Sequence, residues 1–260
     1  MRKLIGLGLF LLIAGNAAAA ELTETIDKTF DVKPGANVML TNVNGRITVS
    51  AWDQPRVRVI AVKRVEADKD DVQAAMKELR VAMTPRNGGL VIVTKQPQES
   101  EGLNGIFAWL AGDHVEASVK YELTVPRSMN LDIENTNGHI VAKNVNGKLD
   151  LETTNGGIDV IGCAGSLEAS TTNGGIDAEL VSVTKGQPLS FETTNGRIEV
   201  TLPSTLAVDV DADTTNGSIK TDLPIATKST DRNSLRGAIN GGGTPLRLRT
   251  TNGGIAIRAH

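Results

Sequence analysis

The chain of 260 residues has little cysteine, few aromatic residues and little net charge. It contains one cysteine, Cys163, which excludes a disulfide within the chain and any metal site built from several cysteines. The formal net charge is -3 at pH 7, whereas a nucleic-acid-binding protein would show a basic patch. Aromatic residues are limited to four Phe, two Trp and one Tyr, while 27 residues are glycine. This composition is unusual for a globular enzyme and indicates many tight turns.

Four common catalytic or cofactor-binding motifs are absent from the sequence. It lacks the Gly-x-Ser-x-Gly nucleophile elbow, the His-Glu-x-x-His zinc motif, a phosphate-binding loop and the dinucleotide-binding glycine fingerprint. The three histidines, His114, His139 and His260, are far apart in the sequence. We therefore expect a protein that is not an enzyme, with no catalytic residues, no cofactor and no metal. Cys163 is expected to be a small buried apolar residue.

The first twenty residues have the pattern of a signal peptide. Arg2 and Lys3 precede an apolar run over residues 4–14, which is too short for a typical membrane-spanning helix. Small residues follow and favour cleavage after Ala19 or Ala20. No other apolar run reaches membrane-spanning length. The pattern predicts an exported protein, periplasmic or extracellular, with no transmembrane span in the mature chain; an N-terminal membrane anchor is the alternative.

The sequence Thr-Asn-Gly occurs six times in the second half of the chain and defines a repeat. The intervals between its asparagines are 18, 18, 22, 21 and 36 residues. The last interval is about two periods and contains a degenerate copy at Asn240, while an earlier copy stands at Asn44. A period near twenty is typical of a solenoid or another array of stacked units. The six asparagines of this predicted turn ladder are Asn137, Asn155, Asn173, Asn195, Asn216 and Asn252.

Within each repeat, apolar and polar residues alternate on both sides of Asn-Gly, as in half-buried strands. In the repeat at Asn155, Leu149 and Leu151 precede the turn, and Ile158 and Val160 follow it with the opposite parity. Asn-Gly is also a strong hairpin signal, so a meander of hairpins is the alternative. Because the same residue types return at the same position, we expect a mainly β, single-stranded β-solenoid with about 18–22 residues per rung. Its asparagines would stack about 4.8 Å apart and satisfy one another's amides.

The N-terminal half departs from the repeat. Residues 68–83 have apolar side chains at helical spacing and acidic residues at the start, which predicts one inserted amphipathic helix. Strands are expected at 56–65, 89–95 and 115–125, and the polar stretch 222–236 is expected to be a loop. The predicted organisation is a signal peptide (1–20), an N-terminal β region with the helix and an apolar loop at 96–114 (21–130), and the repeat (131–260).

A short apolar cluster within the predicted loop at 96–114 is the candidate partner contact. It either caps an open end of the core or forms an exposed tip that meets a partner or a membrane surface. Its residues are Ile106, Phe107, Trp109 and Leu110.

The outward positions of the repeat are rich in acidic residues. Stacked repeats would gather them into an acidic face that ends in Arg247 and Arg249. Because like charges at ladder spacing repel, the face is interpreted either as a solvated surface that prevents edge aggregation or as a weak site for cations or a basic partner. The sequence departs from the Gly-Gly-x-Gly-x-Asp pattern of calcium-binding rolls. The acidic residues are Asp132, Glu134, Asp150, Glu152, Glu168, Glu192, Asp211 and Asp213.

Taken together, these features resemble a known bacterial family. An early Asn-Gly-Arg-Ile-Thr-Val segment with Trp52 close behind, one helix flanked by strands, and repeated Thr-Asn-Gly-x-Ile units are similar to an exported β-strand-repeat family called "putative adhesin" or toast-rack. The resemblance covers roughly residues 24–258. It implies a β-solenoid at the cell envelope. The family carries no established activity, so it supplies no functional residues to transfer.

The sequence therefore predicts a non-enzymatic exported protein that serves as a structural or interaction module, adhesin-like, at the bacterial envelope. Its partner would be an envelope protein or a glycan of unknown identity. The alternative is a solenoid that binds or processes carbohydrate. Sugar-binding sites usually use aromatic platforms, and the repeats offer only Phe191, but a catalytic pair among the many carboxylates stays open.

Overall fold

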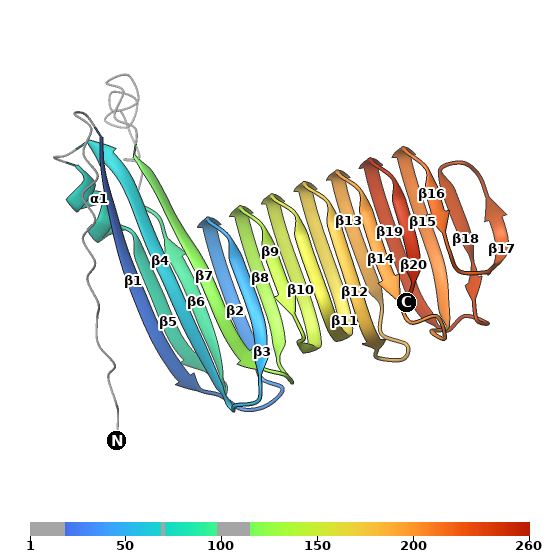
Figure 1. Ribbon diagram of the computed structural model, residues 1–260, viewed down its shortest axis with the longest axis horizontal. Coiled ribbons are helices and arrows are strands. Elements are labelled where there is room, and N and C mark those ends of the chain that lie inside the picture. Colours follow the sequence, from blue (N-terminus) through green and yellow to red (C-terminus); the bar gives the residue numbers. More distant parts are fainter. Residues whose placement is uncertain (1–18, 69–70, 98–114) are drawn as a thin grey trace.

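The computed structural model describes residues 19–68, 71–97 and 115–260. Within these ranges the chain forms twenty β-strands and one short helix, and the strands lie side by side along the long axis of the molecule (Figure 1). The prediction of a mainly β protein is confirmed. Residues 1–18 of the predicted signal peptide lie outside the described residues.

The strands pair in two series, which we call the first and second layers. In spatial order the first layer contains β5 (Arg80–Arg86), β6 (Gly89–Lys95), β2 (Asn37–Asn44), β8 (Asn130–Asn137), β10 (Asn146–Asn155), β11 (Ile158–Asn173), β13 (Leu189–Asn195), β19 (Thr244–Asn252), β15 (Val208–Asn216), β18 (Ser234–Ile239) and β17 (Ile225–Thr230). The second contains β1 (Ala19–Asp31), β4 (Arg56–Asp68), β7 (Glu116–Pro126), β3 (Ile47–Trp52), β9 (Ile140–Lys143), β11 again, β12 (Ile176–Val183), β14 (Ile198–Leu202), β20 (Ile255–Ala259) and β16 (Ile219–Thr221).

Each Asn-Gly corner carries the chain from a strand of the first layer to a strand of the second. At Asn155, for example, β10 ends and β11 begins three residues later at Ile158. Leu149 and Leu151 before the corner and Val160 after it are buried, so the change of parity lets both strands face one core. The pairing of repeats is parallel and in register, which brings each apolar residue beside its counterpart.

The order of the last two repeats in space differs from their order in the sequence. Strand β19 pairs with β13 on one side and with β15 on the other, so the C-terminal repeat lies between two repeats that precede it. Charge favours this order, because Arg249 then lies opposite Glu192 on one side and Asp213 on the other. Stacking in sequence order would place two carboxylates opposite each other, which is unfavourable.

The prediction that Asn240 belongs to a degenerate copy of the repeat is wrong. Its backbone has a positive φ of 50°, and its side-chain amide donates to the carbonyl oxygens of Ser204 and Leu206, outside the ladder of repeat asparagines. The polar stretch 222–236 is also not one loop, as predicted. It contains β17 and the start of β18, and β18 pairs antiparallel with both β15 and β17.

The predicted helix over 68–83 is shorter in the structure, and the residues after it form a strand. Helix α1 spans Val72–Glu78, with Val72, Ala75 and Met76 buried, and it contacts β4 and β1. Leu79 is extended, and β5 then pairs antiparallel with β6. Pairing with β6 outweighs the helical spacing of the sequence in this segment. The strands predicted at 56–65, 89–95 and 115–125 are confirmed as β4, β6 and β7.

Among the residues that the structure describes, no helix has both the length and the apolar character needed to cross a membrane.

Candidate functional site

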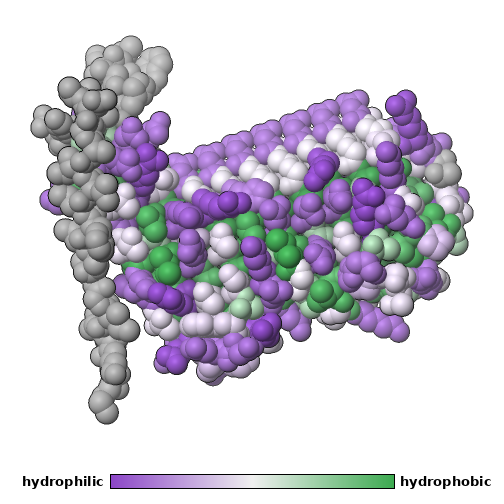
Figure 2. Space-filling model, viewed as in Figure 1, coloured by the Kyte–Doolittle hydropathy of each residue, from purple (hydrophilic) through white to green (hydrophobic). Residues whose placement is uncertain are grey.

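The repeat asparagines form one continuous hydrogen-bonded ladder along an edge of the molecule. Each side-chain amide after the first donates to the side-chain oxygen of the asparagine that precedes it in space, at 2.7–2.8 Å. The first, Asn44, donates to the backbone carbonyl of Ala117. Figure 2 shows a regular row of hydrophilic residues along this edge. In spatial order the ladder is Asn44, Asn137, Asn155, Asn173, Asn195, Asn252 and Asn216.

A second ladder lies inside the corner and was not predicted. In each Thr-Thr-Asn-Gly copy the first threonine is buried, and its hydroxyl donates to the carbonyl of the corner glycine in the neighbouring repeat. Asn42 and Asn135 occupy the same position in the first two repeats, and Asn135 donates to the carbonyls of Gly45 and Gly138. The buried threonines are Thr153, Thr171, Thr193, Thr214 and Thr250. The repetition of Thr-Asn-Gly is thus accounted for by structure alone.

The two adjacent threonines of one corner allow a matched test. Thr193 donates to the Gly174 carbonyl at 2.8 Å, whereas Thr194 is exposed. We expect Thr193→Val to lower the free energy of unfolding by about 1–2 kcal/mol, because the partly buried carbonyl of Gly174 loses its donor. Thr194→Val should change it by about 0.5 kcal/mol or less. Urea denaturation measures both, and equal effects would contradict the ladder.

The predicted acidic residues lie in two columns on the outer side of the first layer. One column pairs Asp150 with Asp132 and Glu168, and the other pairs Glu152 with Glu134. Glu192 continues the second column after Ser170. These six carboxylates take part in no ion pair within the described part of the chain.

The remaining two predicted acids, Asp211 and Asp213, are neutralised by arginines. Arg249 contacts both carboxylates at 3.1 Å, and Arg236 contacts Asp211 at 3.0 Å. Burial alone would raise the pKa of Asp211, but the hydrogen bond from Arg236 and the charges of Arg249 and Arg236 lower it below its ordinary value. Of the eight predicted acids, only the six from Asp132 to Glu192 therefore have no ion pair with a described residue.

On the second layer a further acidic column contains Asp159, Asp177 and Glu199. Partial burial, followed by the charge of Glu199, raises the pKa of Asp177 above its ordinary value of 3.8, although Arg197 lies 3.6 Å away. The folded state therefore holds this proton more tightly than the unfolded state. Ionisation of Asp177 opposes folding at pH values above 3.8.

Neutralising this carboxyl should consequently stabilise the protein at neutral pH. We expect Asp177→Asn to raise the melting temperature at pH 7, by a small amount because the carboxyl is half exposed. The difference should disappear as the pH falls below 3.8, where both states are protonated. Thermal melts at pH 7 and pH 3 measure the effect, and a variant less stable than the wild type at pH 7 would contradict it.

In the described part of the chain, no cluster of three or more His, Cys, Asp or Glu residues suited to a metal occurs. His139 Nε2 lies 2.8 Å from Asp159 Oδ2 without the geometry of a hydrogen bond, and His260 contacts the Leu180 carbonyl at 3.0 Å. Cys163 is buried, as expected, and this burial raises the pKa of its thiol.

The aromatic residues of the described ranges are not arranged as a sugar-binding platform. Phe191 and Tyr121 are fully buried in the core. The Tyr121 hydroxyl forms a 2.6 Å hydrogen bond with Thr94, and burial raises its pKa to about 12. Phe30 packs against the core, and Trp52 donates to the Arg56 carbonyl. The candidate partner contacts Ile106, Phe107, Trp109 and Leu110 lie outside the described residues.

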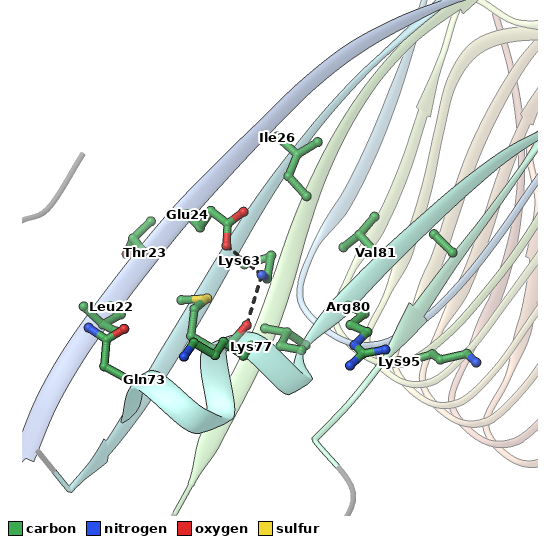
Figure 3. Close-up of a pocket in the computed structure, with 13 residues that line it drawn as sticks. Leu22, Thr23, Glu24, Ile26, Lys63, Gln73, Lys77, Arg80, Val81 and Lys95 are labelled. Atoms are coloured by element: carbon green, nitrogen blue, oxygen red, sulfur yellow. Dashed lines mark hydrogen bonds and ion pairs between the residues drawn. The ribbon is translucent and has the colours of Figure 1, made fainter. Parts of the chain in front are cut away.

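Sequence reasoning missed a pocket of about 800 Å³ at the N-terminal end, between β1, α1 and β5 (Figure 3). The buried Lys63 lies in its wall and donates to Glu24 Oε2 at 2.7 Å and to the Met76 carbonyl at 3.1 Å. The signal was present in the sequence, because Lys63 occupies an inward position of β4, between Ala61 and Val65. A cation at an inward position of a strand indicates a polar partner inside the fold.

The chain matches one protein family and resembles several solved structures. The family described as Toastrack DUF4097 matches residues 28–258. Similar solved structures include a "putative cell adhesion protein" from Clostridium sporogenes, with 12% identity, a TM-score of 0.46 and coverage of 91% of this chain and 100% of that chain. "Putative adhesins" from Bacteroides fragilis (11%, TM-score 0.41, 91% and 97% coverage) and Parabacteroides merdae (9%, 0.29, 90% and 95%) also resemble it. A search of curated proteins finds no match.

Proposed function

Because the chain belongs to the Toastrack DUF4097 family, we propose that it is an exported, non-enzymatic β-solenoid that serves as an adhesin-like interaction module at the bacterial envelope. The observation that carries this proposal is the in-register stacking of seven corners through a continuous asparagine ladder, which buried threonine hydrogen bonds accompany at five of the corners. Stacked repeats of this kind hold an extended surface in a fixed shape, and solenoid proteins use such surfaces to bind partners.

The acidic columns of the first layer supply the proposed contact surface. Six carboxylates on neighbouring strands present charge in register and without internal counterions in the described ranges, so a basic partner surface would be complementary. Such complementarity mainly sets the association rate and partner choice, and it weakens at high salt. Export rests on the pattern of residues 1–20, and the adhesin-like role rests on the family resemblance.

The experiment is capture from solubilised native envelopes on immobilised protein at low and high salt. We expect a captured envelope protein whose binding is lost at high salt and in the variant Asp150→Asn/Glu152→Gln/Glu168→Gln/Glu192→Gln. The matched control removes four exposed acids elsewhere: Glu78→Gln, Glu116→Gln, Glu179→Gln and Asp231→Asn. The assigned surface would be contradicted if the acidic-column variant still captured the envelope protein, or if both variants failed to capture it.

A glycan array with the same two variants separates this function from the carbohydrate alternative. We expect no glycan bound above background. Binding to a defined glycan, abolished by the acidic-column variant and retained by the control, would overturn the protein-binding proposal. Release of sugar from a bound polysaccharide would overturn the non-enzymatic proposal.

A further inference from the structure

The proposed function makes no use of the pocket at the N-terminal end. One side of it is apolar and is built by side chains of β1, α1 and β5 and by Leu79, which connects α1 to β5 (Figure 3). Leu79 is fully buried and Met76 is 8% exposed, while the other apolar side chains are partly buried. The volume of about 800 Å³ falls within the range of small-molecule sites. Apart from the exposed Ala82, the apolar lining residues are Leu22, Ile26, Met76, Leu79 and Val81.

The charged lining is strongly asymmetric. Lys63 and Glu24 neutralise each other through their 2.7 Å ion pair, so they add no net charge to the pocket. The other charged lining residues are Lys77, Arg80 and Lys95, and all three are exposed cations. None of them takes part in an ion pair with any residue that the structure describes. An anion would be electrostatically complementary to this rim.

The register of two strands supplies an independent reason to expect an anion. Arg80 on β5 and Lys95 on β6 are directly opposite each other in the antiparallel pair. Like charges in opposed positions destabilise a sheet. An anionic group between them would replace this repulsion with charge-assisted hydrogen bonds, which are among the stronger polar contacts in proteins.

We propose that this pocket binds an amphipathic anion, a single-chain amphiphile with a carboxylate or phosphate head. The head lies against Arg80 and Lys95, with Lys77 nearby at the C-terminal turn of α1. The apolar chain lies against the side chains of β1, α1 and β5. The Lys63–Glu24 pair serves as a neutral polar wall and is not displaced. Binding of this ligand is independent of the acidic columns of the first layer.

Isothermal titration calorimetry tests the proposal with dodecanoate, dodecyl phosphate and dodecyltrimethylammonium, each below its critical micelle concentration. We expect at least one anion to bind with unit stoichiometry and the cationic amphiphile not to bind. The tighter of the two anions distinguishes a fatty-acid head from a phosphate-ester head. Octanoate should bind more weakly than dodecanoate, because less apolar surface is buried. Absence of binding by both anions, or equal binding of the cationic amphiphile, would overturn the proposal.

Variants locate the head group. Arg80→Gln/Lys95→Gln should weaken binding of the preferred anion by about tenfold or more, through loss of two charge-assisted contacts. Lys143→Gln/Lys148→Gln removes the same net charge at exposed positions outside the pocket and should leave the affinity unchanged. Unchanged melting temperatures in both variants exclude a folding defect. Equal affinity of the two variants would overturn the assigned position of the head group.

Discussion

Replacing Gly174 with alanine is expected to lower the free energy of unfolding by about 3 kcal/mol or more. A Cβ atom at this corner would overlap the carbonyl oxygen of Gly156 in the neighbouring repeat. That carbonyl cannot move freely, because Thr171 donates to it at 2.8 Å and the Gly156 amide donates to the Asn173 carbonyl at 3.0 Å. Urea denaturation followed by circular dichroism measures the loss.

Gly186 provides the matched control for this substitution. It has a positive φ of 75°, and no atom lies within 4 Å of the place that a Cβ atom would take, so alanine meets only backbone strain. We expect Gly186→Ala to lower the free energy of unfolding by about 1 kcal/mol. If Gly174→Ala proved no more damaging than Gly186→Ala, close contact between stacked corners would not be the reason for the repeated glycine.

Removing the C-terminal repeat, residues 244–260, is expected to expose the repeat that precedes it in the sequence. Among the residues that the structure describes, β15 pairs in parallel only with β19, and β16 pairs only with β20. Deletion therefore takes away every parallel contact of the repeat at Asn216. Because stacked repeats are stabilised mainly by their nearest neighbours, the repeats at Asn137, Asn155 and Asn173 should stay folded.

Hydrogen exchange followed by mass spectrometry measures this outcome strand by strand. We expect amides of β15 and β16 to lose protection in the truncated chain, while those of β8 and β10 keep it. Retained protection in β15 and β16 would mean that this repeat stacks directly on β13 and β14, as it would if the repeats followed sequence order.

Much of the fold follows from sequence reasoning because its cause is local and repeated. The alternation around Leu149 and Ile158 predicts two half-buried strands, and the change of parity locates the corner between them. Stacking of identical asparagines follows from the constant position of Asn-Gly in each unit. The acidic columns follow from the same alignment, since register fixes which outward side chains are neighbours.

The parts that sequence reasoning missed depend on contacts between distant segments. The repeats at Asn216 and Asn252 have similar apolar residues, so hydrophobic pattern alone allows either to stack on β13. The charges of Glu192, Arg249 and Asp213 favour the observed order, and this signal becomes visible only once strands are compared as neighbours. The short helix likewise depends on β6, which recruits residues 80–86 into a strand.

In the candidate sites too, features set by the repeat could be predicted, whereas features set by contacts between distant segments could not. The acidic columns could be predicted residue by residue, but the pairing of Asp211 with Arg236 required the unexpected strand β18. The pocket requires β1, α1 and β5 to meet, and only the inward position of Lys63 pointed towards it in the sequence.

Cysteine cross-linking tests the central claim, that the repeats stack in register with the last one inserted between two earlier ones. Ser190 on β13 is directly opposite Arg247 on β19, and Asp211 on β15 lies one strand further. Adjacent strands are about 4.8 Å apart, within the Cα separation of a disulfide, whereas twice that distance exceeds it. Under mild oxidation, Ser190→Cys/Arg247→Cys should form an intramolecular disulfide and Ser190→Cys/Asp211→Cys should not. A disulfide in the second variant and none in the first would contradict the account.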